Sequence, residues 1–281
     1  MGDKTGIEWA DATWNPVTGC TKVSPGCKHC YAERHWARLS APGQPYAGRK
    51  FTDVALHRER LEQPLRWLRP RRIFVNSMSD LFHEDVPDEF IWRVFMVMRE
   101  AARHTFQVLT KRPVRMYQFL FDHWPQIADF PLENVWLGVS VENQQTAEER
   151  IPVLLDTPAA VRFVSLEPLL EQVRLAGIRV STSRPYPVYL NAFTGLHHTT
   201  WIDDKVPKPR PALDWLIVGC ESGPKRRPMN PEWVRALIRE CGLYRKPLFV
   251  KQVEIDSRVN HNPDEWPLWM RQRHYPAAVV L

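Results

Sequence analysis

The stretch Val135-Trp136-Leu137-Gly138-Val139-Ser140 indicates the fold of this 281-residue chain. It is apolar along its length rather than alternating, which is the pattern of a β-strand covered on both faces. A helical pattern from Gln144 to Leu155 follows it after a few residues. A buried strand that leads into a helix is the repeating unit of a parallel α/β sheet.

The same unit recurs along the chain in both directions from this stretch. Further strands are expected at the apolar runs Arg72–Asn76, Phe106–Thr110, Val161–Ser165, Trp215–Gly219 and Leu248–Lys251. Further helices are expected at about Tyr31–Leu39, Asp88–His104, Val114–Trp124 and Pro231–Cys241. Six or seven such units predict an α/β fold, a partial (βα)6-type parallel barrel that forms one domain over residues 1–281.

One segment, residues 177–211, interrupts this repeat. It is rich in Pro, Thr, Ser and His and has no clean periodicity. We interpret it as an insertion between the fifth and sixth units. Loops of this length are uncommon and often functional, so a lid or substrate loop and a merely decorative or disordered excursion are both open interpretations.

Composition and charge bound the class of protein. Hydrophobic residues make up 44% and charged residues 25%, as in globular proteins. No apolar run is long enough to span a bilayer, and the first residues lack the pattern of a signal peptide. We therefore expect a cytoplasmic protein that does not act at a membrane. Lys and Arg exceed Asp and Glu by 38 − 32 = 6, which favours an anionic partner, although many soluble proteins carry such a charge.

Three of the five cysteines lie close together, Cys20, Cys27 and Cys30, with six and then two residues between them. In a cytoplasmic protein such a group is more often a metal site than a disulfide framework. Thiolates suit iron–sulfur clusters, zinc and copper(I). Three thiolates on a four-iron cluster would leave one iron open to a small ligand. Zinc is the alternative, with His29 or His35 as its fourth ligand.

Polar side chains follow six of the predicted strands. In a βα barrel the carboxyl ends of the strands meet at one face, where active sites lie. One residue of this kind is often a helix cap or turn residue, as Asp80 and Asn143 would be. Six polar strand ends predict a shared cavity, and their mixture of carboxylates and cations suits a zwitterionic ligand. The residues are Asn76, Ser77, Ser79, Asp80, Lys111, Ser140, Glu142, Glu167, Glu221 and Lys251.

The runs Trp14–Cys20 and Cys27–Glu33 resemble the cluster loop of radical S-adenosylmethionine enzymes. More specifically, they resemble a phage- and prophage-encoded, three-cysteine family of radical-SAM-like proteins without settled function, as do Val218–Pro224 and Phe249–Gln252. Most members of the superfamily space their cysteines three and then two, so the first gap here departs from that pattern. The resemblance implies a 4Fe–4S cluster on the three cysteines, S-adenosylmethionine as cofactor, and an electron donor such as flavodoxin or ferredoxin.

The resemblance also implies roles for the polar residues. The stretch Asn76–Asp80, with Ser77 and Ser79, occupies the place that binds the methionine amino group, although it lacks the common Gly-Gly-Glu. Ser140 and Glu142 occupy the place of the ribose-binding strand end, and His29 occupies the place of an aromatic residue near adenine. The remaining residues would bind the methionine carboxylate or the substrate, and they are Lys111, Glu167, Glu221 and Lys251.

The leading hypothesis is an enzyme that cleaves S-adenosylmethionine reductively to a 5′-deoxyadenosyl radical, which acts on an unknown substrate. The positive charge makes a nucleotide or nucleic acid the candidate substrate class. A polyanion contact is favoured at Lys225–Arg227, whereas Arg58–Arg72 reads better as a solvated helix face. The alternative is a zinc-stabilised nucleic-acid-binding protein without catalysis, and a third possibility is an electron-transfer or regulatory protein that carries the cluster.

Overall fold

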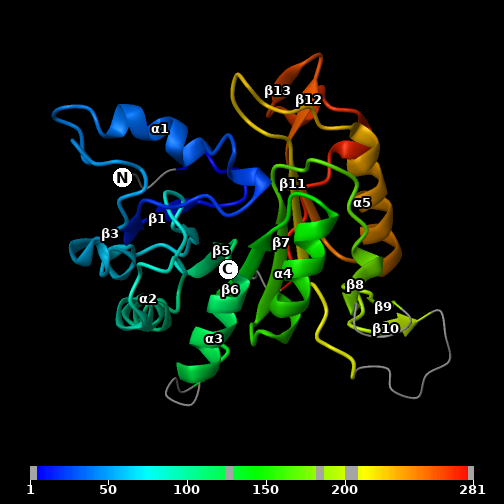
Figure 1. Ribbon diagram of the computed structural model, residues 1–281, viewed down its shortest axis with the longest axis horizontal. Helices are drawn as coiled ribbons and strands as arrows, with labels where there is room; N and C mark the ends of the chain where they lie inside the picture. The colour runs from blue at the N-terminus through cyan, green and yellow to red at the C-terminus, as the bar shows by residue number, and fades with distance from the viewer. Residues whose placement is uncertain (1–4, 124–128, 182–186, 200–207, 278–281) are drawn as a thin grey trace.

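The computed structural model describes residues 5–123, 129–181, 187–199 and 208–277. Its centre is an eight-stranded sheet with the strand order β1-β4-β5-β6-β7-β11-β12-β13 (Figure 1). All pairings from β1 to β12 are parallel, and β13 joins β12 antiparallel. The predicted α/β class with a parallel sheet is therefore confirmed. The strands are β1 Ala12–Trp14, β4 Arg72–Val75, β5 Thr105–Thr110, β6 Val135–Ser140, β7 Val161–Leu166, β11 Trp215–Gly219, β12 Leu248–Ile255 and β13 Arg258–Asn260.

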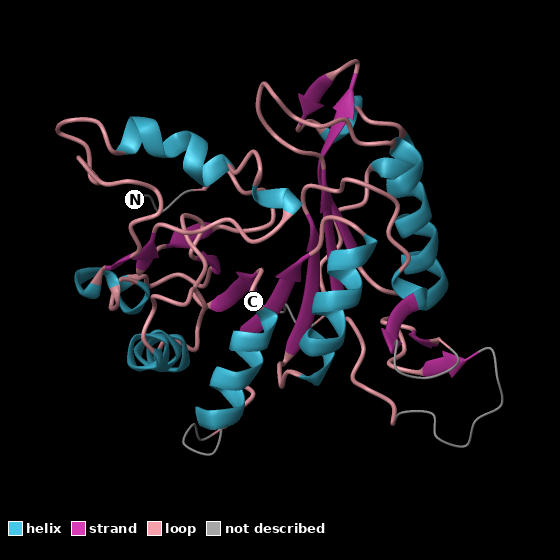
Figure 2. Cartoon of the chain, in the orientation of Figure 1, coloured by secondary structure: helices cyan, strands magenta, loops and turns pink. Residues whose placement is uncertain are grey.

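Helices alternate with the strands and lie around the outside of the sheet (Figure 2). They are α1 Tyr31–Leu39, α2 Asp88–Glu100, α3 Pro113–His123, α4 Gln144–Asp156 and α5 Pro231–Tyr244. Short 3₁₀ helices occur at Pro25–Cys27, Arg58–Arg60, Pro64–Arg66, Leu175–Gly177, Pro263–Glu265 and Leu268–Met270. Asn143 caps α4 by accepting a hydrogen bond from the Thr146 N–H, as its capping interpretation predicts.

Helix α2 ends at Glu100 rather than at His104. Ala101 leaves the helical conformation, and the chain turns so that the buried His104 Nε2 donates to the Pro64 carbonyl at 3.0 Å. Helix α3 was expected to reach Trp124, which lies outside the described residues.

The two faces of the sheet carry different cores because side chains alternate along each strand. On β11, Leu216 and Val218 join the large core that also holds the helices. Trp215 and Ile217 point to the other face, into a smaller and mostly aromatic cluster with Trp9 and residues of β4, β6, β7 and β12. The smaller cluster fills the inside of the curved sheet.

Side chains link the two ends of the parallel part of this sheet. In the described residues no strand pairing joins β1 to β12. Instead Trp9, which precedes β1, lies 4.7 Å from Phe74 of β4 and 6.3 Å from Trp215 of β11, measured between ring centroids. Tyr275 packs on Trp215 and on Phe249 from the other direction. We call this group of aromatic residues, Trp9, Phe74, Trp215, Phe249 and Tyr275, the seam.

The insertion lies between β7 and β11, as predicted, but its described part is not structureless. It forms an antiparallel sheet of β8 Ile178–Ser181, β9 Val188–Leu190 and β10 His197–Thr199. The Asn191 Nδ2 donates to the Tyr244 hydroxyl at 2.8 Å, and Phe193 stacks on Tyr244. The small sheet and the loop between β9 and β10 therefore pack against α4 and the last residue of α5 (Figure 1). Residues 182–186 and 200–207 of the insertion lie outside the described part.

Candidate cofactor site at the carboxyl ends of the strands

A cavity of about 610 Å³ lies at the carboxyl ends of the strands. Its rim is polar and its wall is partly apolar, with Ile7, Trp9, Phe74 and Leu109. This combination is typical of small-molecule sites. The predicted site residues that line it are Cys27, His29, Cys30, Ser77, Lys111, Ser140, Glu167, Glu221 and Lys251. No described residue of the 177–211 insertion lines the cavity, so that part of the insertion does not act as its lid.

The cysteines belong to one loop, residues 20–30, which we call the cysteine loop. Cys20 follows the two-residue strand β2 Val17–Thr18, which pairs with β3 Ala55–Leu56. Cys27 ends a 3₁₀ turn, and Cys30 immediately precedes α1. All three are partly exposed free thiols. Among the described residues, no three His, Cys, Asp or Glu side chains stand close enough together to form a metal site.

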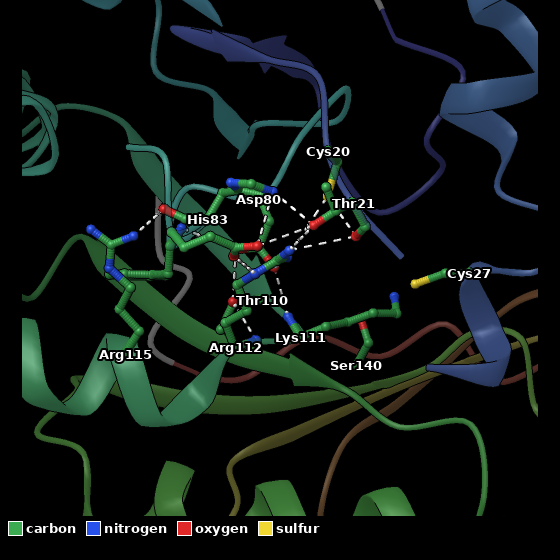
Figure 3. Close-up of polar contacts among 12 residues, drawn as sticks. Cys20, Thr21, Cys27, Asp80, His83, Thr110, Lys111, Arg112, Arg115 and Ser140 are labelled. Atoms are coloured by element: carbon green, nitrogen blue, oxygen red, sulfur yellow. Dashed lines mark hydrogen bonds and ion pairs between the residues drawn. The ribbon is translucent and has the colours of Figure 1, made fainter. Parts of the chain in front are cut away.

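Cys20 lies beside a polar network of Arg112, Asp80 and Thr21 (Figure 3). The Arg112 Nη1 donates to the Cys20 Sγ at 3.8 Å, and Arg112 Nη2 donates to the Thr21 Oγ1 at 2.8 Å. Burial, and then the Asp80 carboxylate, raises the pKa of the Cys20 thiol to about 11, while Arg112 acts in the opposite direction. Cys20 is thus the cysteine beside a buried cation, and it does not line the cavity.

Asp80 belongs to this network and does not line the cavity. Its carboxylate accepts hydrogen bonds from the Thr110 Oγ1 at 2.7 Å, the Lys111 N–H at 2.9 Å and the Phe82 N–H at 3.0 Å. It also accepts from Arg112 at 3.4 Å. The carboxylate therefore ties the end of β5 to the turn after β4.

Glu142 anchors the middle of the cysteine loop. Its side chain is 0% exposed, and it accepts from the Ser24 Oγ at 2.8 Å and from Arg150 at 3.2 Å. The Lys111 Nζ lies 3.7 Å away. Burial alone would raise the pKa of Glu142, but Lys111 and Arg150 hold it below its ordinary value. The charged Glu142 carboxylate therefore holds the cysteine loop through Ser24, and Glu142 does not line the cavity.

Glu221 anchors the end of the loop that carries Cys30. It accepts from the His29 Nδ1 at 3.0 Å and from the Arg227 N–H at 2.8 Å, and the Arg227 guanidinium also pairs with it. Burial alone would raise the pKa of Glu221, but the hydrogen bonds from Arg227 and His29 lower it. Arg34 of α1 donates to the Ser222 carbonyl at 2.8 Å, which fixes the same helix to the same turn.

The turn after β4 carries the next group of predicted residues. Asn76 has a positive φ of 60°, and its Oδ1 accepts from the Val17 N–H at 3.2 Å. The Asn76 Nδ2 is buried and has no hydrogen-bond partner in the described part of the chain. Ser77 lines the cavity and donates to the Asn15 Oδ1 at 3.2 Å, whereas Ser79 donates to the Val17 carbonyl at 2.9 Å. Of these three, Ser77 alone lines the cavity.

An ion pair stands inside the cavity at the ends of β7 and β12. The Lys251 Nζ lies 3.1 Å from the Glu167 Oε1, and both residues line the cavity. Burial alone would lower the pKa of Lys251, but Glu167 raises it above its ordinary value, so the ammonium stays charged at neutral pH. A Cβ at Gly219 would lie 2.6 Å from the same Glu167 oxygen, so the glycine leaves room for the carboxylate. Cys220 lies beside this pair and also lines the cavity.

Sequence reasoning missed the arginines that complete the network. Arg112 and Arg150 received no role, although Arg150 interrupts the apolar face Ala147, Ile151 and Leu154 of α4. A lone cation on such a face is a signal for a buried anionic partner, since an unpaired buried charge is costly. In the basic run at Lys225–Arg227, the arginines pair internally with Glu254 and Glu221, so only Lys225 keeps the exposure that the polyanion interpretation requires.

The fold and the site define an α/β protein with a mostly parallel sheet, whose polar strand ends and cysteine loop surround one cavity. The chain belongs to the DUF5131 family, described as proteins of unknown function, whose family model matches residues 4–264. Comparisons with curated proteins and with solved structures found no match. None of the helices in the described ranges has the length and apolar character to cross a membrane.

Proposed function

We propose that this protein is a radical-SAM-like iron–sulfur enzyme that cleaves S-adenosylmethionine reductively. The observation that carries the proposal is the convergence of Cys27 and Cys30 with the polar ends of β4, β5, β6, β7, β11 and β12 on one cavity. A ligand with an amino acid head, a ribose and a base needs cations, anions and hydroxyls in one place. The strand ends supply all three kinds.

The donor chemistry fits a 4Fe–4S cluster held by Cys20, Cys27 and Cys30. Three soft thiols on one loop are a ligand set that leaves one iron open, and the other two cysteines, Cys220 and Cys241, are buried outside this loop. The unpartnered Asn76 Nδ2 is a buried donor still lacking an acceptor, beside Ser77 of the cavity wall. In the described part of the chain, no three potential ligands stand close enough together to hold a metal. The fit therefore rests on the chemistry of these donor atoms. When bound, the cluster supplies the electron that splits S-adenosylmethionine into methionine and a 5′-deoxyadenosyl radical.

The residues of the cavity then have separate tasks. Lys111 and Lys251 offer ammonium groups to a carboxylate, and Glu167 accepts from an amino group or a ribose hydroxyl. Ser140 lies beside Ser165 in the sheet register, so two hydroxyls face the cavity together. The apolar wall formed by Trp9, Phe74 and Leu109 excludes water from the reacting groups.

Five predicted site residues take positioning roles in this proposal rather than touching the cofactor. Asp80 and Glu142 hold the cysteine loop through Arg112 and Ser24. Glu221 and His29 fix the loop beside Cys30, although both also line the cavity. Ser79 fastens the turn after β4 to Val17.

The partners remain part of the proposal. A nucleotide or nucleic acid is the proposed substrate class, because the chain carries an excess of six positive charges. A flavodoxin or ferredoxin is the proposed electron donor, and the proposed location is the cytoplasm. The alternative function remains a zinc-stabilised nucleic-acid-binding protein.

Anaerobic purification and reconstitution with iron and sulfide test the proposal. We expect a brown protein with about four irons per chain that forms 5′-deoxyadenosine from S-adenosylmethionine after reduction by dithionite. A colourless protein with one zinc and no iron would support the alternative function. A reduced iron protein that never forms 5′-deoxyadenosine would indicate electron transfer or regulation instead.

A further inference from the structure

We propose that Arg112 is the residue that positions the Cys20 sulfur as a metal ligand and compensates its charge. Nothing in the sequence pattern assigns a role to this arginine. The identity of the metal rests on the proposed function, but the contact between the guanidinium and the sulfur does not. Arg112 is thus a positioning residue, because it acts through Cys20.

The guanidinium is fixed before any metal binds. The Arg112 side chain is 10% exposed and directly precedes α3. Its Nε donates to the Glu84 Oε2 at 2.9 Å, its Nη2 to the Thr21 Oγ1 at 2.8 Å, and its Nη1 lies 3.4 Å from the Asp80 Oδ2. Because the guanidinium is planar, these acceptors determine where the remaining Nη1–H points. That group lies 3.8 Å from the Cys20 Sγ (Figure 3).

The acceptors are themselves held by the fold. Asp80 accepts from Thr110 and from the Lys111 N–H, so it cannot turn toward the cavity. Thr21 is hydrogen-bonded at 2.8 Å to the Nε2 of His83, whose Nδ1 accepts from the Asp85 N–H. Thr21 is therefore held by Arg112 from one side and by His83 from the other. The position of the Cys20 sulfur therefore depends on Arg112 and its hydrogen-bonded neighbours Asp80 and Thr21, as well as on the cysteine loop.

The same geometry has an electrostatic consequence for a metal centre. Cys20 is the cysteine for which the structure gives a hydrogen bond from a cationic side chain. Hydrogen bonds and positive charge at a ligand sulfur favour the reduced, more negative state of an iron–sulfur cluster. Outer contacts of this kind also orient the ligand and increase metal affinity. Arg112 should therefore affect both metal occupancy and reduction potential.

The experiment compares Arg112→Gln and Arg112→Lys with Arg115→Gln in the full chain. Arg115 is a matched control, because it also ties down the turn after β4. It donates to the carbonyls of His83 and Val86 and pairs with Asp88 at 3.0 Å, yet it has no described contact with a cysteine. Thermal unfolding of each metal-free variant separates misfolding from an effect on the metal. Iron, sulfide and zinc content and the midpoint potential, followed by electron paramagnetic resonance, are then measured.

We expect Arg112→Gln to fold, to bind less metal per chain and to have a more negative midpoint potential than the wild type. Arg112→Lys keeps the positive charge but loses the planar guanidinium. Its midpoint potential should therefore lie between those of the wild type and Arg112→Gln. Arg115→Gln should match the wild type in both readouts. Wild-type occupancy and potential in Arg112→Gln would overturn the proposal. If that variant does not fold, a wild-type potential in Arg112→Lys would overturn it.

Failure of the proposed function gives a different result. A wild-type protein that takes one zinc and no iron contradicts the radical-SAM proposal and leaves the contact testable through zinc affinity. In that case Arg112→Gln should bind zinc more weakly than Arg115→Gln. Equal zinc affinity in these two variants would overturn the role of Arg112.

Discussion

Gly26 lies directly against Glu142, so that a Cβ at position 26 would overlap the Glu142 carboxylate and its Cγ. The glycine is part of the cysteine loop, and the glutamate lies two residues beyond the end of β6. The loop thus approaches the sheet at a point where no side chain fits between them. Cys27, the next residue, takes its place in the cavity wall from this contact.

The first prediction concerns Gly26→Ala. The added methyl group overfills the contact with Glu142, which should lower the free energy of unfolding by about 1–3 kcal/mol and reduce metal loading. Urea unfolding of the metal-free protein measures the first effect. Gly242→Ala in α5 is the control, because a Cβ there meets nothing within 4 Å. It should stabilise the protein by about 0.5–1 kcal/mol, and a destabilisation equal to that of Gly26→Ala would contradict the prediction.

The second prediction concerns the pH dependence due to Glu142. Its pKa in the folded protein lies below its ordinary value of 4.5, so its contribution to stability is present above that value and is lost as the pH falls through the folded pKa. Glu142→Gln leaves the buried Arg150 without its anion, which should cost about 3–5 kcal/mol at neutral pH. The difference in unfolding free energy between Glu142→Gln and the wild type should therefore become smaller as the pH falls. Urea unfolding at a series of acid pH values measures this difference.

The control for this variant is Glu149→Gln, which changes an exposed residue of the same helix. It should change the free energy of unfolding by less than about 0.5 kcal/mol at every pH. A Glu142→Gln variant whose gap to wild type stays constant from neutral to acid pH would show that the carboxylate is not charged in the folded protein.

The third prediction separates two cysteines that line the same cavity. Cys27→Ala should abolish iron–sulfur loading, because it removes one of three ligands. Cys220→Ala should retain it at a cost of about 1 kcal/mol in stability. Cys220 is buried and directly follows β11, so it lies outside the cysteine loop that carries the three proposed ligands. Iron and sulfide analysis decides, and equal loss of iron in both variants would mean that the ligands are wrongly assigned.

The fourth prediction concerns Lys251→Met. Loss of a charged hydrogen bond to the carboxylate of the proposed cofactor is worth about 1.5–3 kcal/mol, so the Kd for S-adenosylmethionine should rise by about 10–140-fold. Equilibrium dialysis of the reconstituted protein measures this change. Lys225→Met removes an exposed lysine outside the cavity lining and should leave the Kd unchanged. An unaltered Kd in Lys251→Met would place the ligand elsewhere.

The sequence predicts the sheet well because local features decide it. The runs Val135–Ser140 and Trp215–Gly219 form strands with the expected bounds, since each is an uninterrupted apolar run that ends at a polar or glycine residue. Helix α1 likewise begins after Cys30 and ends at Leu39, as expected. In contrast, the sheet β8–β10 depends on pairing between short segments and on the contact of Phe193 with Tyr244, which no local pattern encodes.

The sequence predicts that polar strand ends share a cavity, since the carboxyl ends of the strands in a parallel sheet meet at one face. Which of their side chains face the cavity depends on partners from other elements. Asp80 and Glu142 turn to Arg112 and Arg150, and these pairs form only once α3 and α4 have packed. In contrast, Lys251 and Glu167 form an ion pair with each other, and both side chains line the cavity.

The seam gives the cavity two unlike walls. One wall, the cysteine loop, is fastened by Asp80, Glu142 and Glu221 through charged hydrogen bonds that require a defined geometry. The lining also contains Trp9, which ring contacts with Phe74 and Trp215 hold in place of charged hydrogen bonds. In the proposed function, the fixed cysteine loop would hold one cofactor, while the aromatic contacts would let the rest of the lining adapt to substrates of different size.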